Sequence, residues 1–259
     1  MDLGTNISAS GVLTAMYRQD VLSNNLANAS TVGFKAMIPA TRQRAAASVE
    51  DGVMQMPSNT LLERLKGGVL LAPNLVDMGQ GAISPRGGPL DVAIEGRGFL
   101  AVRKPGGNDG GEDAALALTR DGRMTRNPAG RLVTTDGFEV LDASGSPITI
   151  APGGEVTIDG NGRISQNGAV VATLKFVDVA DPGALRPLGN GMLDAKAGTE
   201  FAEASGRLIQ GSVEESGVDE IRTIMQITSA SREVEANISM MRQIDRLNGE
   251  LFNTFARLT

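Results

Sequence analysis

A chain of 259 residues with 41% hydrophobic residues is long enough to bury a core, as one large domain or as two modest ones. Its formal charge of −6 and the lack of any Lys/Arg-rich cluster argue against nucleic-acid binding. The chain contains no His and no Cys, which excludes a structural zinc site, a Ser-His-Asp triad and a cysteine nucleophile. We therefore expect a structural or binding protein rather than an enzyme, with no cofactor.

The sequence lacks the marks of a membrane or secretory segment. No window reaches about 18 uninterrupted apolar residues, the length that a membrane-spanning helix requires. Asp2, Arg18 and Asp20 interrupt the N-terminal segment, where a secretory signal peptide would need a continuous apolar run. We therefore expect no membrane span and no cleaved signal peptide, so that any export uses another route.

Residues 4–28 predict a helix, because they lack proline and carry apolar residues throughout. These apolar residues point in several directions on a helical wheel instead of forming one stripe. Such a helix must be covered on most sides. At a chain terminus, this favours burial by neighbouring subunits over the alternative of a buried central helix.

The helix should end within an asparagine-rich stretch, Ser23–Lys35. Three asparagines lie within five residues there, and their side-chain amides compete with the hydrogen bonds of the helical backbone. Gly33 then permits a sharp turn, and Phe34 offers one large apolar anchor. The competing interpretation is an ordinary helix end with no further role.

Residues 36–80 predict a connector with a short helix or none. Hydrophobic periodicity weakens here, prolines recur at Pro39 and Pro57, and the Gly67-Gly68 pair interrupts the chain. A basic triplet, Arg42-Gln43-Arg44, is more typical of a solvated face than of a binding patch.

Residues 81–215 have the pattern of an antiparallel β domain. Turn dipeptides such as Asp121-Gly122, Asp136-Gly137 and Asn161-Gly162 recur at strand-like intervals. Short strands at this spacing predict a barrel or a sandwich, with an exposed loop at residues 106–111. The strand-like runs are Asp91–Glu95, Gly98–Val102, Arg131–Thr134, Glu139–Leu141, Ile148–Ile150, Val156–Ile158 and Val170–Val177.

Residues 216–259 predict a second helix. Ser216 is its expected N-cap, and its apolar residues follow each other at steps of three or four, as in a coiled-coil-like seam. About forty residues give a rod of roughly 60 Å, which needs a partner helix, and the nearest candidate is residues 4–28. The expected fold class is therefore α+β: long N- and C-terminal helices pair as a coiled-coil-like module beside a central antiparallel β barrel or sandwich-like domain.

Features that suggest chemical sites have simpler explanations. Carboxylate pairs such as Asp219/Glu220 fall in or near a helix whose exposed face would normally carry them. The run Asp159–Arg163 begins like a calcium loop, but Arg163 occupies a ligand position and no Glu closes the loop. We therefore expect no catalytic, cofactor-binding or metal-binding residues.

Several separated segments of the chain, in order, resemble the flagellar axial proteins that build the bacterial rod and hook. The family patterns that they match are NNLANxxTxGFK, PLDVAIxGxGFF, TRxGxF, GxLVTxDG, LExSNVD and RxxEAN. The departures are Gly217 in place of Asn, Leu100 in place of a second Phe, and Arg123-Met124 in place of a small residue and Phe. The matching segments are Ser23–Lys35, Pro89–Phe99, Thr119–Gly122, Gly130–Gly137, Val213–Asp219 and Arg232–Asn237.

The resemblance implies a structural subunit of the flagellar basal-body rod, exported by the flagellar type III apparatus and polymerised with helical symmetry into part of the drive shaft. Residues 1–35 and 216–259 would form the terminal helical assembly module, 36–80 the connector and 81–215 the central β domain. The terminal ends, loose in the monomer, would become ordered by burial of their apolar residues on assembly. The implied location is the periplasm-spanning rod.

The resemblance also implies partners and an interface. The partners are copies of the same chain, other rod and hook proteins, the export apparatus and the surrounding basal-body rings, with no nucleic acid. The expected interface residues are Leu22, Asn24, Asn25, Leu26, Asn28, Gly33, Phe34, Ile224, Ile227, Arg232, Val234, Glu235, Asn237, Ile238, Met241, Ile244, Leu247, Leu251 and Phe255.

Alternatives stay open at this point. Among rod subunits with a central β domain, the loosely matched connector favours the proximal subunit over the distal one. A hypothesis from another functional class is that the chain is a free oligomeric binding module, for example a polysaccharide-binding β domain on a coiled-coil stalk. A carboxylate-dependent glycosidase is the third interpretation, which the loss or persistence of sugar hydrolysis in Asp91→Ala and Asp121→Ala would test.

Overall fold

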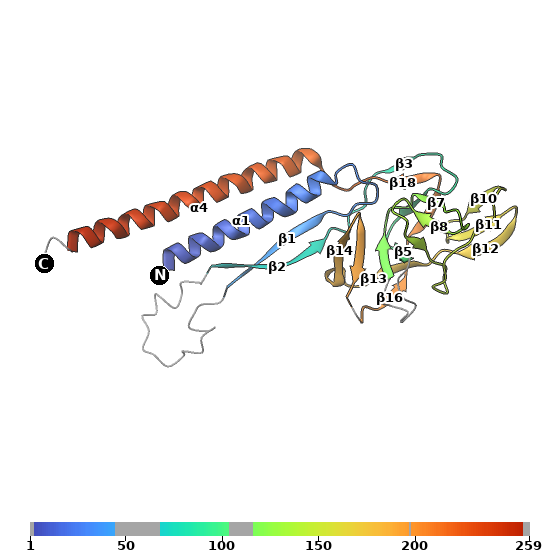
Figure 1. Cartoon of the computed structure of the whole chain (residues 1–259), viewed down its shortest axis with the longest axis horizontal. Coiled ribbons are helices and arrows are strands. Elements are labelled where there is room, and N and C mark those ends of the chain that lie inside the picture. The colour runs from blue at the N-terminus through green and yellow to red at the C-terminus, as the bar shows by residue number, and fades with distance from the viewer. Residues whose placement is uncertain (1–2, 45–67, 104–115, 197, 256–259) are drawn as a thin grey trace. The chain divides into compact units, whose positions relative to one another are not determined.

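The computed structural model describes residues 3–44, 68–103, 116–196 and 198–255 (Figure 1). The chain divides into two compact units. The helical unit comprises Met1–Leu26, Met37–Asn74 and Glu220–Thr259, and the β unit comprises Ala27–Ala36 and Leu75–Asp219. The segment Ala27–Ala36 therefore folds with the β unit, although the residues on both sides of it belong to the helical unit.

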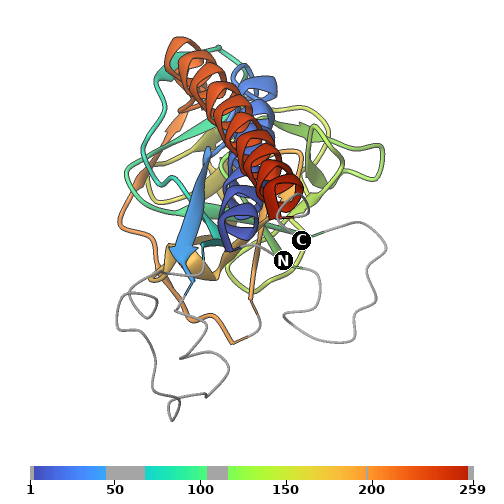
Figure 2. The ribbon, with the colours of Figure 1, turned by 90° about the vertical axis from the view of Figure 1, so that its left-hand side faces the viewer.

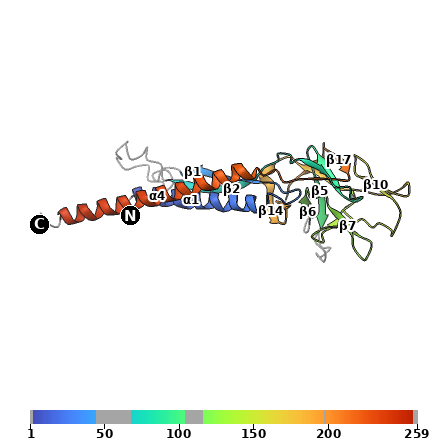
Figure 3. The ribbon, with the colours of Figure 1, turned by 90° about the horizontal axis from the view of Figure 1, so that it is seen from above.

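The helical unit contains the two predicted terminal helices, α1 (Leu3–Ala27) and α4 (Glu220–Phe255). At 1.5 Å per residue they are about 38 and 54 Å long. They run side by side in three views (Figures 1–3). Ser216 is not the cap of α4, because it lies before the helix and its hydroxyl accepts a hydrogen bond from the Val218 amide at 3.3 Å.

Contacts between α1 and α4 recur at seven-residue steps. The Cα of Gly4 faces Ile244, and that of Gly11 faces Asn237, so the two helices run antiparallel. A Cβ on Gly4 would lie 3.1 Å from Ile244 Cδ1, which shows how closely the α1 backbone approaches α4. Seven residues further along α1, or about two turns, Arg18 forms a 2.9 Å ion pair with Glu233.

The helical unit also contains a two-stranded sheet, where the sequence predicted a connector with a short helix or none. Its strands are β1 (Met37–Gln43) and β2 (Val69–Val76). The last two residues of β2, Leu75 and Val76, belong to the β unit. The sequence analysis did not predict these strands. In β2 the exposure of the side chains, and not their polarity, alternates from residue to residue as in a strand. Most of the remaining connector, residues 45–67, lies outside the described residues.

The β unit is built from short antiparallel strands. Its largest sheet follows the order β14-β15-β6-β5-β9-β8-β7, with β13 pairing with β5 and β16, and β10-β11-β12 form a second sheet. Two pairs complete the unit, β17 with β4 and β18 with β3. The strand bounds are β3 Ile83–Pro85, β4 Val92–Glu95, β5 Phe99–Arg103, β6 Leu116–Thr119, β7 Met124–Arg126, β8 Leu132–Thr134, β9 Glu139–Val140, β10 Val156–Ile158, β11 Arg163–Gln166, β12 Ala169–Thr173, β13 Phe176–Val179, β14 Leu185–Gly189, β15 Met192–Ala195, β16 Phe201–Glu203, β17 Arg207–Gln210 and β18 Ser212–Glu214.

The predicted antiparallel domain is confirmed, but the described strands form no closed barrel. The path of the largest sheet ends at β14 on one side and at β7 on the other. The run Val170–Val177 is two strands, β12 and β13, and Ile148–Ile150 contributes only an isolated bridge from Thr149 to Arg131. The expected loop at residues 106–111 lies outside the described residues.

Two apolar clusters share strand β5. Leu100 and Val102 belong to the first cluster, with residues such as Ile94 and Leu132. Phe99 and Ala101 belong to the second, with residues such as Leu118. Because successive strand side chains point to opposite faces, β5 is buried on both sides and forms the centre of the β unit.

Candidate assembly interface and a buried charge cluster

The asparagine-rich stretch ends α1 through one buried side chain. Asn25 donates from Nδ2 to the carbonyl of Met37 at 2.8 Å and accepts the Met37 amide on Oδ1 at 2.9 Å. It thereby pairs with the first residue of β1 as a neighbouring strand would. Leu22 is also buried, Leu26 is half-buried and Asn24 is exposed. Asn28 accepts hydrogen bonds from Thr31 through both its carbonyl and its side chain.

Gly33 and Phe34 lie in the β unit and are both buried. Gly33 has φ of +68°, as the predicted turn requires, and its amide donates to the carbonyl of Glu214 at 2.7 Å. A Cβ at this position would lie 2.3 Å from the Asp121 nitrogen and 2.4 Å from the Arg120 carbonyl carbon. Glycine is therefore required here both by conformation and by close backbone contact.

A buried cluster of charges surrounds Glu214. Its two carboxylate oxygens accept from Lys35 Nζ at 2.7 Å and from Arg120 Nη1 at 3.0 Å. The Gly81 amide donates to the same oxygen as Lys35, at 2.9 Å. The three charged side chains are between 1% and 3% exposed. Two cations and one carboxylate give this buried cluster one excess positive charge. The stability of each charged group therefore depends on its partners.

The cations of this cluster have further partners. Lys35 also donates to the Gly79 carbonyl at 2.7 Å. Burial is the main cause that lowers the pKa of Lys35 below its usual value, and the hydrogen bond that Lys35 donates to Glu214 acts in the opposite direction. Arg120 donates to the Gly96 carbonyl at 2.7 Å, and its guanidinium lies 5.3 Å from the centre of the Phe99 ring.

Sequence reasoning did not select this cluster, although Lys35, Arg120 and Glu214 each stand in one of the family-like segments. The available signal was that each of these segments carries a charged residue beside apolar or small ones. What the sequence could not supply is their meeting point, because they lie far apart along the chain.

The residues predicted for the interface on α4 fall into two groups. Those half-buried in the single chain are Ile227, Val234, Asn237, Ile238, Met241 and Ile244. Those exposed are Ile224, Arg232, Glu235 and Leu247; the side chains of Leu251 and Phe255 lie outside the described residues.

Large apolar side chains are exposed on both helices. On α4, Ile224 is 51% and Leu247 is 59% exposed. On α1, Leu13 and Met16 are exposed and belong to the apolar residues that were expected to need cover. On α4, sequence reasoning missed Ile221, Met225 and Met240, because they fall outside the steps of the predicted seam.

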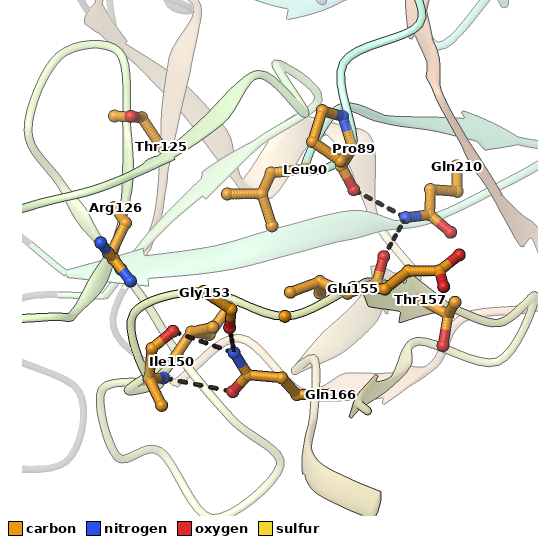
Figure 4. Close-up of a pocket in the computed structure, with 13 residues that line it drawn as sticks. Pro89, Leu90, Thr125, Arg126, Ile150, Gly153, Glu155, Thr157, Gln166 and Gln210 are labelled. Atoms are coloured by element: carbon orange, nitrogen blue, oxygen red, sulfur yellow. Dashed lines mark hydrogen bonds between the residues drawn. The ribbon is translucent and has the colours of Figure 1, made fainter. Parts of the chain in front are cut away.

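The β unit carries an open groove of about 590 Å³ (Figure 4). Gln210 spans the carbonyls of Pro89 and Val156, and Gln166 holds the backbone of Ala151 and Gly153, so both amides support the groove walls. The charged side chains at the groove, Arg126 and Glu155, are exposed.

The part of the chain that the structure describes contains no group of three or more His, Cys, Asp or Glu side chains placed to hold a metal ion. Neither of its two helices is both long and apolar enough to span a membrane. The features that remain are the apolar helix surfaces and the charge cluster.

Two family models match parts of this chain. A family model described as flagella basal body rod protein matches residues 6–35, and one described as flagellar hook protein FlgE/F/G D1 domain matches residues 93–172. The flagellar basal-body rod protein FlgF of Caulobacter vibrioides is 33% identical over 245 residues, which cover 93% of each chain. The chain belongs to the flagellar basal-body rod protein family.

Other rod proteins match over similar lengths. FlgF of Mesorhizobium japonicum is 27% identical and covers 96% of this chain and 95% of its own. FlgG of Caulobacter vibrioides is 26% identical and covers 93% of this chain and 94% of its own. Rod proteins are structural proteins of the flagellar basal body and not enzymes, so this chain has a structural role in motility, as its sequence resemblance predicted.

Proposed function

We propose that this rod protein polymerises with helical symmetry through its terminal helices and forms part of the flagellar drive shaft. Residues 1–35 and 216–259 are the assembly module, 36–80 the connector and 81–215 the central β domain. The partners are copies of the chain and other rod and hook proteins, within the periplasm-spanning rod. The subunit reaches this place through the flagellar export apparatus, and the surrounding rings are further partners.

The exposed apolar residues of α4 are the observation that carries this proposal. Ile221, Ile224 and Met225 leave most of their surface to solvent in the single chain. Fully burying a side chain of this size is favourable by about 1.5–3 kcal/mol, so several of them in a neighbouring subunit offset the entropy of ordering the ends. Contacts that repeat from subunit to subunit without closing extend into a filament.

The pairing of α1 with α4 is part of the same proposal. The Gly4–Ile244 and Gly11–Asn237 contacts are separated by seven residues on each helix, which supports a coiled-coil-like module. The half-buried residues of α4 then hold α1, while the exposed residues meet other subunits. The two predicted groups of interface residues therefore have different tasks.

The test is the substitution Ile224→Glu in cells that lack the wild-type gene. We expect loss of swimming and absence of the subunit from purified basal bodies, because a carboxylate replaces an apolar side chain at a buried contact. The control is Ser229→Glu, which places the same charge at another exposed position of α4. Normal swimming with Ile224→Glu would contradict the proposed contact. A discrete small oligomer of the purified wild-type chain, with no subunit in basal bodies, would favour the free binding module.

A further inference from the structure

The two ends of the β unit meet at the charge cluster. Along the chain, the first segment of the β unit is Ala27–Ala36, and its second segment, Leu75–Asp219, ends shortly after β18, whose last residue is Glu214. Two hydrogen bonds of 2.7 Å join these ends directly: Gly33 donates to the Glu214 carbonyl, and Lys35 donates to the Glu214 carboxylate. The segment Ala27–Ala36 and the end of β18 are therefore hydrogen-bonded directly to each other.

The same residue also ties both ends to the body of the β unit. Arg120, which follows β6, binds the second carboxylate oxygen of Glu214. The amide of Glu215 donates to Ala82, and that of Gly81 donates to the Glu214 carboxylate. Glu214 therefore joins the segment Ala27–Ala36, the loop before β3 and the end of the central strand β6.

Close packing and burial make this joint stiff. Gly33 lies against the backbone of Arg120 and Asp121, and a Cβ on Gly81 would lie 1.9 Å from the Glu215 carbonyl oxygen. The three charged side chains exclude water almost completely, so loss of one partner leaves a buried charge uncompensated. Separating the two ends requires that these contacts break together.

We infer that Lys35, Arg120 and Glu214 form a mechanical clamp, which holds the two ends of the β unit together when the helical termini are pulled or twisted. Load that arrives from either terminus reaches the Gly33–Glu214 and Lys35–Glu214 bonds before it reaches the sheets. The role as a load-bearing joint in a rotating shaft rests on the proposed function. The clamp itself is a property of the single chain and is measured without assembly.

Force spectroscopy of the full chain tests the clamp. Because the chain has no Cys, the exposed positions Ser30 and Gly217 accept cysteine handles at the two ends of the β unit. In this background we expect Lys35→Met to raise the rate of forced opening by about tenfold or more. Glu214→Gln removes the charge that balances both cations, so its effect should be larger.

Two controls separate the clamp from a general loss of stability. Glu139→Gln removes another buried carboxylate, which pairs with Arg131, and should leave the opening rate along this axis unchanged. Handles on the exposed residues Thr135 and Asn161 pull the β unit along another axis, where Lys35→Met should have little effect. The clamp is refuted if Lys35→Met opens at the wild-type rate, or if it accelerates opening equally along both axes. Neither outcome bears on the assembly test with Ile224→Glu.

Discussion

Gly33 illustrates how one residue can meet two demands at once. Its positive φ costs a residue with a side chain about 1–2 kcal/mol, and the short distances from its Cβ position to Arg120 and Asp121 add an overpacking cost of about 1–3 kcal/mol. We therefore expect Gly33→Ala to lower the free energy of unfolding of the β unit by about 3 kcal/mol, as measured by urea denaturation.

Gly137 provides the matched control for this substitution. Its φ is +83°, but a Cβ there would meet no atom within 4 Å. Gly137→Ala should therefore cost only the conformational part, about 1–2 kcal/mol. Equal losses for the two variants would show that the close contact at Gly33 relaxes without cost.

Single residues were predictable from the sequence where the cause is local. The asparagines signalled the end of α1, and Gly33 signalled a turn, because both effects depend on the backbone of neighbouring residues. The partner of Lys35 was not predictable, since Glu214 lies 179 positions away in the chain. The charge cluster depends on the topology of the β unit and appears only when the strands are in place.

At the scale of elements, the lack of proline predicted α1 and apolar periodicity predicted α4, but neither showed which side of α4 is covered. The half-buried Ile227, Val234 and Met241 and the exposed Ile224 and Leu247 are equally apolar in the sequence. The contacts of Gly4 and Gly11 select the covered side, because small residues let the two backbones approach. Sequence reasoning places large apolar residues at contacts and overlooks the glycines opposite them.

The three-stranded sheet β10-β11-β12 depends on one amide side chain of β17. Gln210 donates to the carbonyls of Pro89 and Val156 at 2.6 and 2.8 Å (Figure 4). It also accepts the Ile158 amide at 3.0 Å. At about 1 kcal/mol for each hydrogen bond, Gln210→Ala should cost about 2–3 kcal/mol. In the Gln210→Ala variant, the rate of amide hydrogen exchange should increase in β10 before it increases in β5.

Gln80 is the matched control for Gln210. Its side chain forms two hydrogen bonds with the backbone, to Ile94 and from Gly96, but Gln80 is exposed, so water can replace them. Gln80→Ala should therefore cost less than about 1 kcal/mol. If Gln210→Ala lowers the free energy of unfolding no more than Gln80→Ala does, the sheet β10-β11-β12 is held by its apolar contacts alone.

At the scale of the whole molecule, each of the two units is built from segments that are separated along the chain. The sequence suggested one boundary near residue 35, but Ala27–Ala36 folds with the β unit and the chain then returns to the helical unit at Met37. No local pattern signals this exchange, because the segment is held by contacts with distant residues such as Glu214. The division follows from long-range hydrogen bonds and not from composition.

Limited proteolysis with trypsin tests this placement in the full chain. Arg18 in α1 and Arg42 in β1 are accessible sites, whereas the Lys35 side chain between them is only 3% exposed. We expect cleavage at Arg18 and Arg42 to release no peptide: the fragment Gln19–Arg42 should stay bound to the β unit on size-exclusion chromatography, with Lys35 uncut. In Glu214→Gln the same fragment should dissociate and Lys35 should be cleaved, because the buried amine has lost its carboxylate. Cleavage at Lys35 as fast as at Arg18 in the wild-type chain would mean that the segment is not docked on the β unit.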